Sequence, residues 1–285
     1  MNIIKNGITL LVFLMPLISF SQATKLKPEI TGDELKQHIS FLAADSLKGR
    51  RPGMPGAESA TKYIQKQLDA YGLKTSLQTF EIVTDIEFGT NNSLVLDSLN
   101  PTMQKDYRPA SFSSSGEFEG LIEWAGFGFD FGQDSMIWKD YERISPEGKW
   151  ALVLRGDPQP EDMNSKLIPF ADDRTKAMVA KEKGAIGLIL VSGQKAEPQD
   201  ELPAMHFDHS VTNAGFPVII ITRKLANYLL AETGYKIEQF EQMMIQEQKP
   251  YACSLKKKLK ATISVNPLKT KTSNIIGIME GSDPG

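Results

Sequence analysis

The stretch DDRTKAMVAKEKGAIGLILVS, residues 172–192, contains the sequence patterns of a helix and of a buried strand, the two kinds of element on which the fold depends. It predicts a helix with an aspartate cap, a stop at Gly184, and then a buried strand. The segment GKWALVLRGD, residues 148–157, predicts a similar strand that leads into a glycine turn. In FPVIIITRKLANYLLAETG, residues 216–234, a strand covered on both faces precedes a helix capped by Thr222. Strands and helices therefore alternate through this region.

The lysine-rich segment SLKKKLKATISV, residues 254–265, is open to two interpretations. Leucine, alanine, isoleucine and valine alternate with lysine, threonine and serine, which is typical of a strand with one buried and one solvated face. A basic surface for a partner is the alternative. We favour a solvated edge strand that lysine protects from aggregation.

Two helices are predicted near the amino end. Thr31-Gly32-Asp33-Glu34 matches a capping box, so we expect a helix over residues 33–44. Two prolines and three glycines between Lys48 and Ala57 argue against regular structure there. A second helix is expected from about Gly56 to a stop at Gly72, followed by a strand.

Composition and the first residues bound the class of protein. The chain has 285 residues and a formal charge of −3, which gives no electrostatic reason to expect nucleic acid or an anionic membrane as partner. Lys5, a thirteen-residue apolar run and the small residues around Ser21 predict a signal peptide over residues 1–21. The run is too short for a membrane anchor, since a span needs roughly 20 apolar residues. We expect a secreted or periplasmic protein that, once cleaved after Ser21, has no membrane attachment.

Several segments resemble known families. GFGFD (126–130), GKWALVLRGDP (148–158), KAMVAKEKGAIGLILV (176–191) and FPVIIITRKLANYLL (216–230) resemble the protease-associated (PA) domain. The segment ISFLAADSLKGRRPGMPGAESATKYIQKQLDAYGLK, residues 39–74, resembles the opening of the zinc-dependent aminopeptidases related to glutamate carboxypeptidase II and the transferrin receptor. In that family a PA domain interrupts the peptidase domain, and a segment like TSNIIGIMEGSDP (272–284) returns to the peptidase sheet.

The resemblance implies an α/β fold in which a β-rich PA domain with flanking helices is inserted into an incomplete α/β zinc-peptidase domain. The expected divisions are a signal peptide (1–21), the first part of the peptidase domain (22–89), the PA domain (90–267) and a truncated return strand (268–285). The family uses two zinc ions and a metal-activated water, and its first ligands lie in a His-x-Asp motif. We expect this chain to end before that motif.

We expect no catalytic, cofactor-binding or metal site within these residues. The chain has three histidines, and none lies in a His-x-Asp pair at a predicted strand end. MHFDHS, residues 205–210, could bind a metal through His206, Asp208 and His209, but a surface loop is the favoured interpretation. His38 is expected to pack and not to ligate.

Three other features have a functional and a structural interpretation. Arg50 and Arg51 could orient a substrate carboxylate, although a loop role through backbone carbonyls is favoured. Cys253 has no second cysteine to pair with and is expected to be a small packed residue. SFSSSG, residues 111–116, lacks the pattern of a serine hydrolase.

The leading hypothesis is therefore the amino-terminal portion of a secreted zinc metallo-aminopeptidase, whose catalytic half is the partner of these residues within the same polypeptide. It would act on peptide or protein substrates, with zinc bound by the full protein and the present residues inactive alone. The alternatives are a stand-alone secreted PA-type module that binds peptides or proteins, and an inactive peptidase relative.

Overall fold

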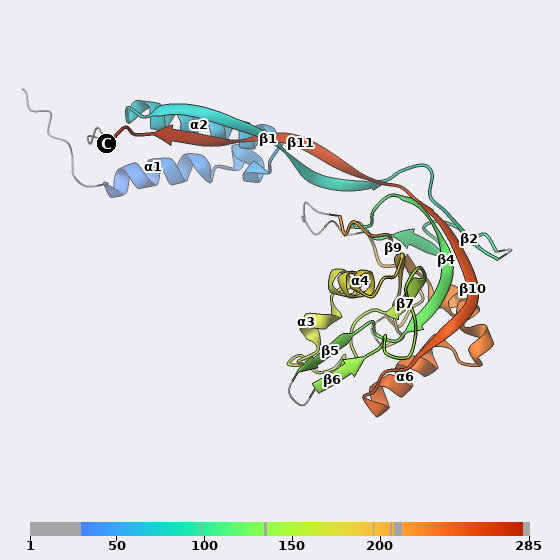
Figure 1. Cartoon of the computed structure of the whole chain (residues 1–285). Helices are drawn as coiled ribbons and strands as arrows, with labels where there is room; N and C mark the ends of the chain where they lie inside the picture. The colour runs from blue at the N-terminus through green and yellow to red at the C-terminus, as the bar shows by residue number, and fades with distance from the viewer. Residues whose placement is uncertain are drawn as a thin grey trace, which may run out of the picture.

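The computed structural model describes residues 30–97, 99–133, 136–195, 197–205, 207 and 213–281. Figure 1 shows a globular domain around a curved sheet and a long arm that extends from it. The predicted signal peptide lies outside the described residues. None of the helices within them is long and apolar enough to cross a bilayer.

A seven-stranded sheet forms the globular domain, with strand order β2-β10-β4-β7-β8-β9-β3. Strands β4, β7, β8 and β9 are parallel to one another, and the other pairings are antiparallel. The strands are β2 (Ser93–Leu96), β3 (Tyr107–Pro109), β4 (Gly116–Ala125), β7 (Trp150–Leu154), β8 (Gly187–Val191), β9 (Val218–Ile221) and β10 (Ala252–Ile263).

Every residue of β7, β8 and β9 is buried, because helices cover both faces of the sheet at its centre. On one face, α4 (Asp173–Glu182) packs Ala177 and Ala180 against the strands. On the other face lie α5 (Arg223–Leu230) and α6 (Ile237–Glu247). The mixed α/β architecture with a β-rich domain and flanking helices confirms the fold class expected from the sequence.

The start and stop signals of these helices act as predicted. Asp172 accepts hydrogen bonds from the N–H groups of Arg174 and Thr175 at the start of α4. Gly184 follows the helix with φ +82°, a left-handed conformation that favours glycine. Thr222 Oγ1 accepts from Leu225 N, at 3.3 Å, and caps α5.

The edge-strand interpretation of residues 254–265 was wrong in part. Lysine and apolar residues do alternate between a solvated and a buried face. However, β10 pairs with β4 on one side and, from Leu259 to Thr262, with β2 on the other. The short strand β2 comes from a segment more than 150 residues earlier in the chain, and β10 is therefore an edge only along its first half.

The arm consists of two helices that lie along a two-stranded antiparallel sheet, which we call the arm hairpin (Figure 1). Strand β1 (Lys74–Phe88) pairs antiparallel with β11 (Val265–Ile278) from end to end. The helices are α1 (Gly32–Leu42), which has the predicted capping box, and α2 (Pro55–Ala70). The segment between them is not entirely irregular, since a 3₁₀ element, η1 (Asp45–Arg50), forms there, with left-handed backbone at Lys48 and Gly49.

The remaining elements are small. Strands β5 (Asp130–Gln133) and β6 (Met136–Lys139) form a hairpin against the globular domain. Short helical elements complete the chain, namely α3 (Ile168–Ala171) and the 3₁₀ turn η2 (Ala231–Thr233). Aromatic side chains pack where the hairpin meets α3: Phe127, Phe129, Phe131, Trp138 and Phe170.

One glycine tests how tightly the sheet centre is packed. A Cβ atom on Gly187 in β8 would lie 2.3 Å from the ring of Trp150 in the neighbouring strand. We expect Gly187→Ala to lower the free energy of unfolding by about 1–3 kcal/mol, the usual cost of overpacking. Urea unfolding of the parent and the variant measures this change in the free energy of unfolding. The control is Gly132→Ala in β5, where a Cβ meets no atom closer than 3.9 Å. Equal stability of the two variants would contradict the packing described here.

Candidate functional site

A group of polar residues of the globular domain lies at the carboxyl ends of the parallel strands. Arg155 directly follows β7, Ser192 follows β8, and Thr222 and Arg223 follow β9. In open α/β sheets this edge is the usual position of ligands, because loops and helix amino termini converge there. It is therefore the candidate functional site.

Arg155 ties two loops to the start of a helix. Its Nε donates to both carboxylate oxygens of Asp173, at 3.1 and 3.0 Å, and its Nη1 donates to Ser192 Oγ at 3.2 Å. Asp173 is the first residue of α4. The ends of β7, β8 and α4 are thereby held together by one guanidinium group.

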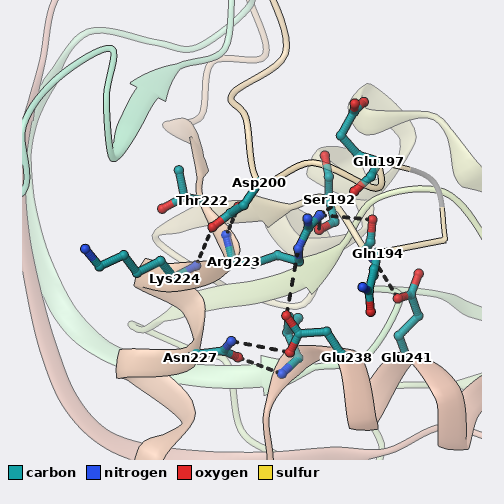
Figure 2. A network of polar contacts seen from close by, with 12 residues as sticks. Ser192, Gln194, Glu197, Asp200, Thr222, Arg223, Lys224, Asn227, Glu238 and Glu241 are labelled. Atoms are coloured by element: carbon teal, nitrogen blue, oxygen red, sulfur yellow. Dashed lines mark hydrogen bonds and ion pairs between the residues drawn. The ribbon is translucent and has the colours of Figure 1, made fainter.

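Arg223 holds the loop that follows β8 (Figure 2). The side chain is 6% exposed, and its two terminal nitrogens donate to the carbonyls of Glu197 at 2.6 Å and Pro198 at 3.0 Å. Its Nε lies 3.8 Å from Glu238 Oε1 on α6. The buried cation is compensated by carbonyl dipoles and one carboxylate, as a buried charge requires.

Carboxylates complete this network from both sides. Asp200 accepts from the backbone N–H groups of Arg223 and Lys224, at 2.6 and 2.9 Å, at the amino end of α5. Glu241 on α6 accepts from Gln194 N at 2.7 Å. Burial raises the pKa of Glu241, while backbone hydrogen bonds from the loop lower it. The loop between β8 and β9 is thus anchored to α5 and α6 (Figure 2).

Lys176 on α4 is a fully buried cation near this edge. Its Nζ donates to the carbonyls of Phe127, Leu154 and Gly156, at 2.7, 2.7 and 2.6 Å, and lies 4.6 Å from the centre of the Phe129 ring. Burial lowers the pKa of Lys176 to about 7. The ammonium group satisfies carbonyls that end β7 and the turn after β4, so it joins two loops below α4.

Asp140 is the second fully buried ionisable group. Its Oδ2 accepts from Phe129 N at 2.9 Å and Trp138 Nε1 at 3.0 Å, whereas Oδ1 has no hydrogen-bond partner among the described residues. Burial raises the pKa of Asp140 to about 7, and the charge of Lys176 opposes that rise. Asp140 anchors the β5–β6 hairpin through its backbone and indole partners.

A cavity of about 330 Å³ opens beside Arg155. Asp172, Asp173 and Ser192 line it, together with Gly156, Ala171 and Glu197. Arg155, Asp173 and Ser192 satisfy one another, and Asp172 caps a helix. The arrangement therefore positions loops and offers a small polar recess, and it does not assemble a nucleophile with a base.

The candidate metal ligands are not brought together in the part of the chain that the structure describes. These residues hold no cluster of three or more histidine, cysteine, aspartate or glutamate side chains suited to a metal. His206, Asp208 and His209 lie outside the described residues. His38 lies on α1, where Nδ1 is 2.8 Å from Tyr63 Oη and Nε2 is 3.1 Å from Tyr71 Oη. Its two ring nitrogens tie α1 to α2.

The other candidates occupy structural positions. Arg51 Nη2 donates to the carbonyl of Thr84 on β1 at 2.7 Å, so it fastens the loop to the hairpin. Ser113 Oγ accepts from Val218 N at 2.8 Å. Ser115 Oγ accepts from Val265 N at 2.9 Å. Cys253 is half-buried, and desolvation raises the pKa of its thiol, which disfavours the reactive thiolate.

Sequence reasoning did not single out Lys176, Asp140 or Arg223. Periodicity could have indicated Lys176, which is four residues before the buried Ala180 and so lies on the same helical face. No comparable local signal existed for Asp140 or Arg223, because their partners come from other segments of the chain.

Comparison with known proteins identifies the globular domain. Residues 94–229 match the PA domain family. The chain contains a PA domain. The matched residues include β7, β8, β9 and α4, and with them Arg155, Lys176 and Arg223, whereas α6, which carries Glu238 and Glu241, follows the matched range. No curated protein matches the chain significantly.

Three solved structures illustrate the similarity of the whole chain. An aminopeptidase from Aneurinibacillus sp. strain AM-1 is 15% identical with a TM-score of 0.46, over 85% of this chain and 47% of its own. BSAP, a zinc aminopeptidase from Bacillus subtilis, is 18% identical with a TM-score of 0.37, over 88% of this chain and 48% of its own. A peptidase M28 precursor from Shewanella amazonensis SB2B is 14% identical with a TM-score of 0.39, over 85% of this chain and 52% of its own. The chain spans about half the length of these structures, and likeness at this level carries no conclusion about activity.

The buried carboxyl group predicts a pH effect on stability. Because the pKa of folded Asp140 is about 7 and its ordinary value is 3.8, the folded state holds this proton more tightly, and the group's contribution to stability falls as pH rises from about 4 to 7. Asp140→Asn removes this titration and keeps an oxygen acceptor. We expect the variant to lose less unfolding free energy than the parent over that range, by at least about 1 kcal/mol.

Urea unfolding at pH 4, 5.5, 7 and 8 measures this difference. Asp130→Asn is the control, since Asp130 is a partly exposed residue of the same hairpin that pairs with Lys183. Parallel pH profiles for the parent and the Asp140→Asn protein would contradict a buried, titrating Asp140.

Proposed function

We propose that this chain is the amino-terminal portion of an exported zinc metallo-aminopeptidase, with its PA domain inserted after the first peptidase elements. The PA domain match supports this, together with the resemblance of residues 39–74 and 272–284 to the two peptidase segments that flank such an insertion. Peptides or proteins are the proposed substrates, hydrolysed from the amino end.

The observation that carries the proposal is the uncovered apolar surface of the arm. Helix α1 exposes Leu35 and Ile39 to 49% and 63%, and strand β11 exposes Ile276 and Ile278 to 39% and 52%. Uncovered apolar area costs about 25 cal/mol per Å² relative to burial. Exposed apolar side chains on both α1 and β11 favour burial against a partner, and the remainder of a peptidase domain is the partner that the sequence resemblance indicates.

The geometry of the hairpin shows which face needs covering. Gly277 packs towards Leu68 and Leu73, so its face of the hairpin meets α2. Residues at the alternate positions, Phe80, Ile276 and Ile278, point to the opposite face. All three are more than a third exposed. One layer of the proposed peptidase domain is therefore present, and the face away from α2 is where its next layer packs.

The proposed zinc ions are not assigned to residues of this chain. The described residues do not offer a ligand cluster. Two zinc ions in the full protein rest on the resemblance alone, as does the expectation that residues 22–285 are inactive by themselves. Export to the periplasm or the medium rests on the pattern of residues 1–21.

A stand-alone secreted PA module that binds peptides is the alternative, since the PA domain match fits it equally well. The coding sequence after residue 285 separates the two. A strand followed by His-x-Asp supports the peptidase, whereas an immediate stop codon supports the binding module and overturns the proposal.

Activity can be tested directly. We expect residues 22–285 to show no hydrolysis of leucine p-nitroanilide above background, with or without added zinc, because the ligand set lies elsewhere. Isothermal titration with zinc should likewise show no binding at submicromolar affinity. Turnover that a chelator abolishes would contradict the assignment of the chemistry to other residues.

The division of the chain predicts its protease sensitivity. We expect brief trypsin treatment to remove the arm first and to leave a core of about residues 90–267, because the PA domain has its own core and the arm does not. Mass spectrometry of the resistant fragment measures its ends. Uniform resistance across the arm and the PA domain would contradict these boundaries.

A further inference from the structure

The first half of β10 has an open edge. Strand β10 pairs with β4 over residues 252–255 and 258–263, with an irregularity at residues 256 and 257, but β2 pairs with it only from Leu259 to Thr262. Over residues 252–258 the other edge has no strand partner among the described residues. An open edge presents backbone N–H and C=O groups that an added strand can satisfy.

A groove runs beside this open edge. It has a volume of about 470 Å³ and lies between β10 on one side and η2 and α6 on the other. Tyr235, Phe240, Met243 and Tyr251 give it an apolar lining, and Cys253 lies on the strand side. An extended segment beside β10 would therefore place every second side chain into an apolar recess.

The lining of the groove combines a buried aromatic side chain with an exposed one. Phe240 is 6% exposed and packs against Trp124, with ring centres 5.3 Å apart. Tyr235 is 47% exposed and lies 5.4 Å from Phe240, centre to centre. A preformed aromatic recess with an exposed tyrosine suits a bulky apolar side chain, since little ordering is needed on binding.

Two charged residues line the groove, Glu232 and Lys256, and the Lys256 ammonium is the charge that can pair with an acidic partner. Lys257 and Lys258 are already paired with Asp97 and Glu119, whereas Lys256 has no ion-pair partner within the described residues. The N–H of Lys256 donates to Glu232 Oε1, which closes the open edge at that point. An added strand can therefore pair along residues 252–255 and reach the free ammonium group of Lys256 with a carboxylate.

We propose that the open edge of β10 and its groove bind an extended peptide segment, which adds as a strand, inserts a bulky apolar side chain and pairs an acidic side chain with Lys256. This proposal goes beyond the peptidase function, because it concerns a surface of the PA domain and requires no metal or hydrolysis. Backbone pairing gives affinity, and the recess and the lysine give specificity.

Fluorescence anisotropy tests the proposal on residues 22–285. The probe is a fluorescein-labelled peptide of alternating valine and threonine with one central phenylalanine and two glutamates at one end. We expect saturable binding, and a loss of about tenfold or more in affinity for Met243→Lys, which puts a charge into the groove. The matched control is Met163→Lys, at a residue that is 90% exposed outside the groove.

A second pair of variants tests the charge. Lys256→Glu should weaken binding of the acidic probe and strengthen binding of a probe with lysines in place of its glutamates. Lys260→Glu, at another exposed lysine of β10 that does not line the groove, should change neither. A probe N-methylated at alternate backbone positions should lose binding, because strand addition needs its N–H groups.

Several results would overturn the proposal: no saturable binding of the probe, equal effects of the Met243 and Met163 variants, equal effects of the two lysine variants, or undiminished binding of the N-methylated probe. Near-ultraviolet circular dichroism of each variant shows whether its fold is retained. These outcomes are independent of any aminopeptidase assay, so failure here leaves the peptidase proposal standing.

Discussion

A single buried ammonium group organises the edge of the sheet on which the polar loops lie. Lys176 enters from α4 and satisfies three backbone carbonyls from two different turns. Removing that cation would leave these buried carbonyls without a hydrogen-bond donor or water. The resulting loss of folding free energy is larger than the net contribution of the hydrogen bonds themselves. The positions of the turn after β4, the end of β7 and the aromatic hairpin β5–β6 all depend on this contact.

Two arginines hold other loops at the same edge of the sheet. Arg155 joins the ends of β7 and β8 to α4, and Arg223 joins the loop after β8 to α5 and α6. Each has several donors in a fixed plane, so one side chain can restrain several loop carbonyls or carboxylates. The polar side chains of the candidate site are consequently paired with one another or with loop carbonyls.

Much of the fold follows from local sequence. Caps at Asp172 and Thr222, the stop at Gly184 and the uninterrupted apolar runs identify helices and strands because these signals act within a few residues. The role of β10 as an edge was misjudged because β2, a short strand far away in sequence, decides it. Asp140 and Arg223 escaped notice for the same reason, since burial and partners are properties of the assembled sheet.

The two connections between the arm and the PA domain leave side by side. Phe88 is paired with Val265, and Gly89 N donates to Ser264 O at 2.9 Å, immediately before the strands diverge. The segment between residues 89 and 264, which forms the globular domain, therefore begins and ends at neighbouring positions beside the β1–β11 ladder. Because Phe88 and Val265 are already paired, a tight turn joining residues 88 and 265 would make β1 and β11 a simple β-hairpin with the same register.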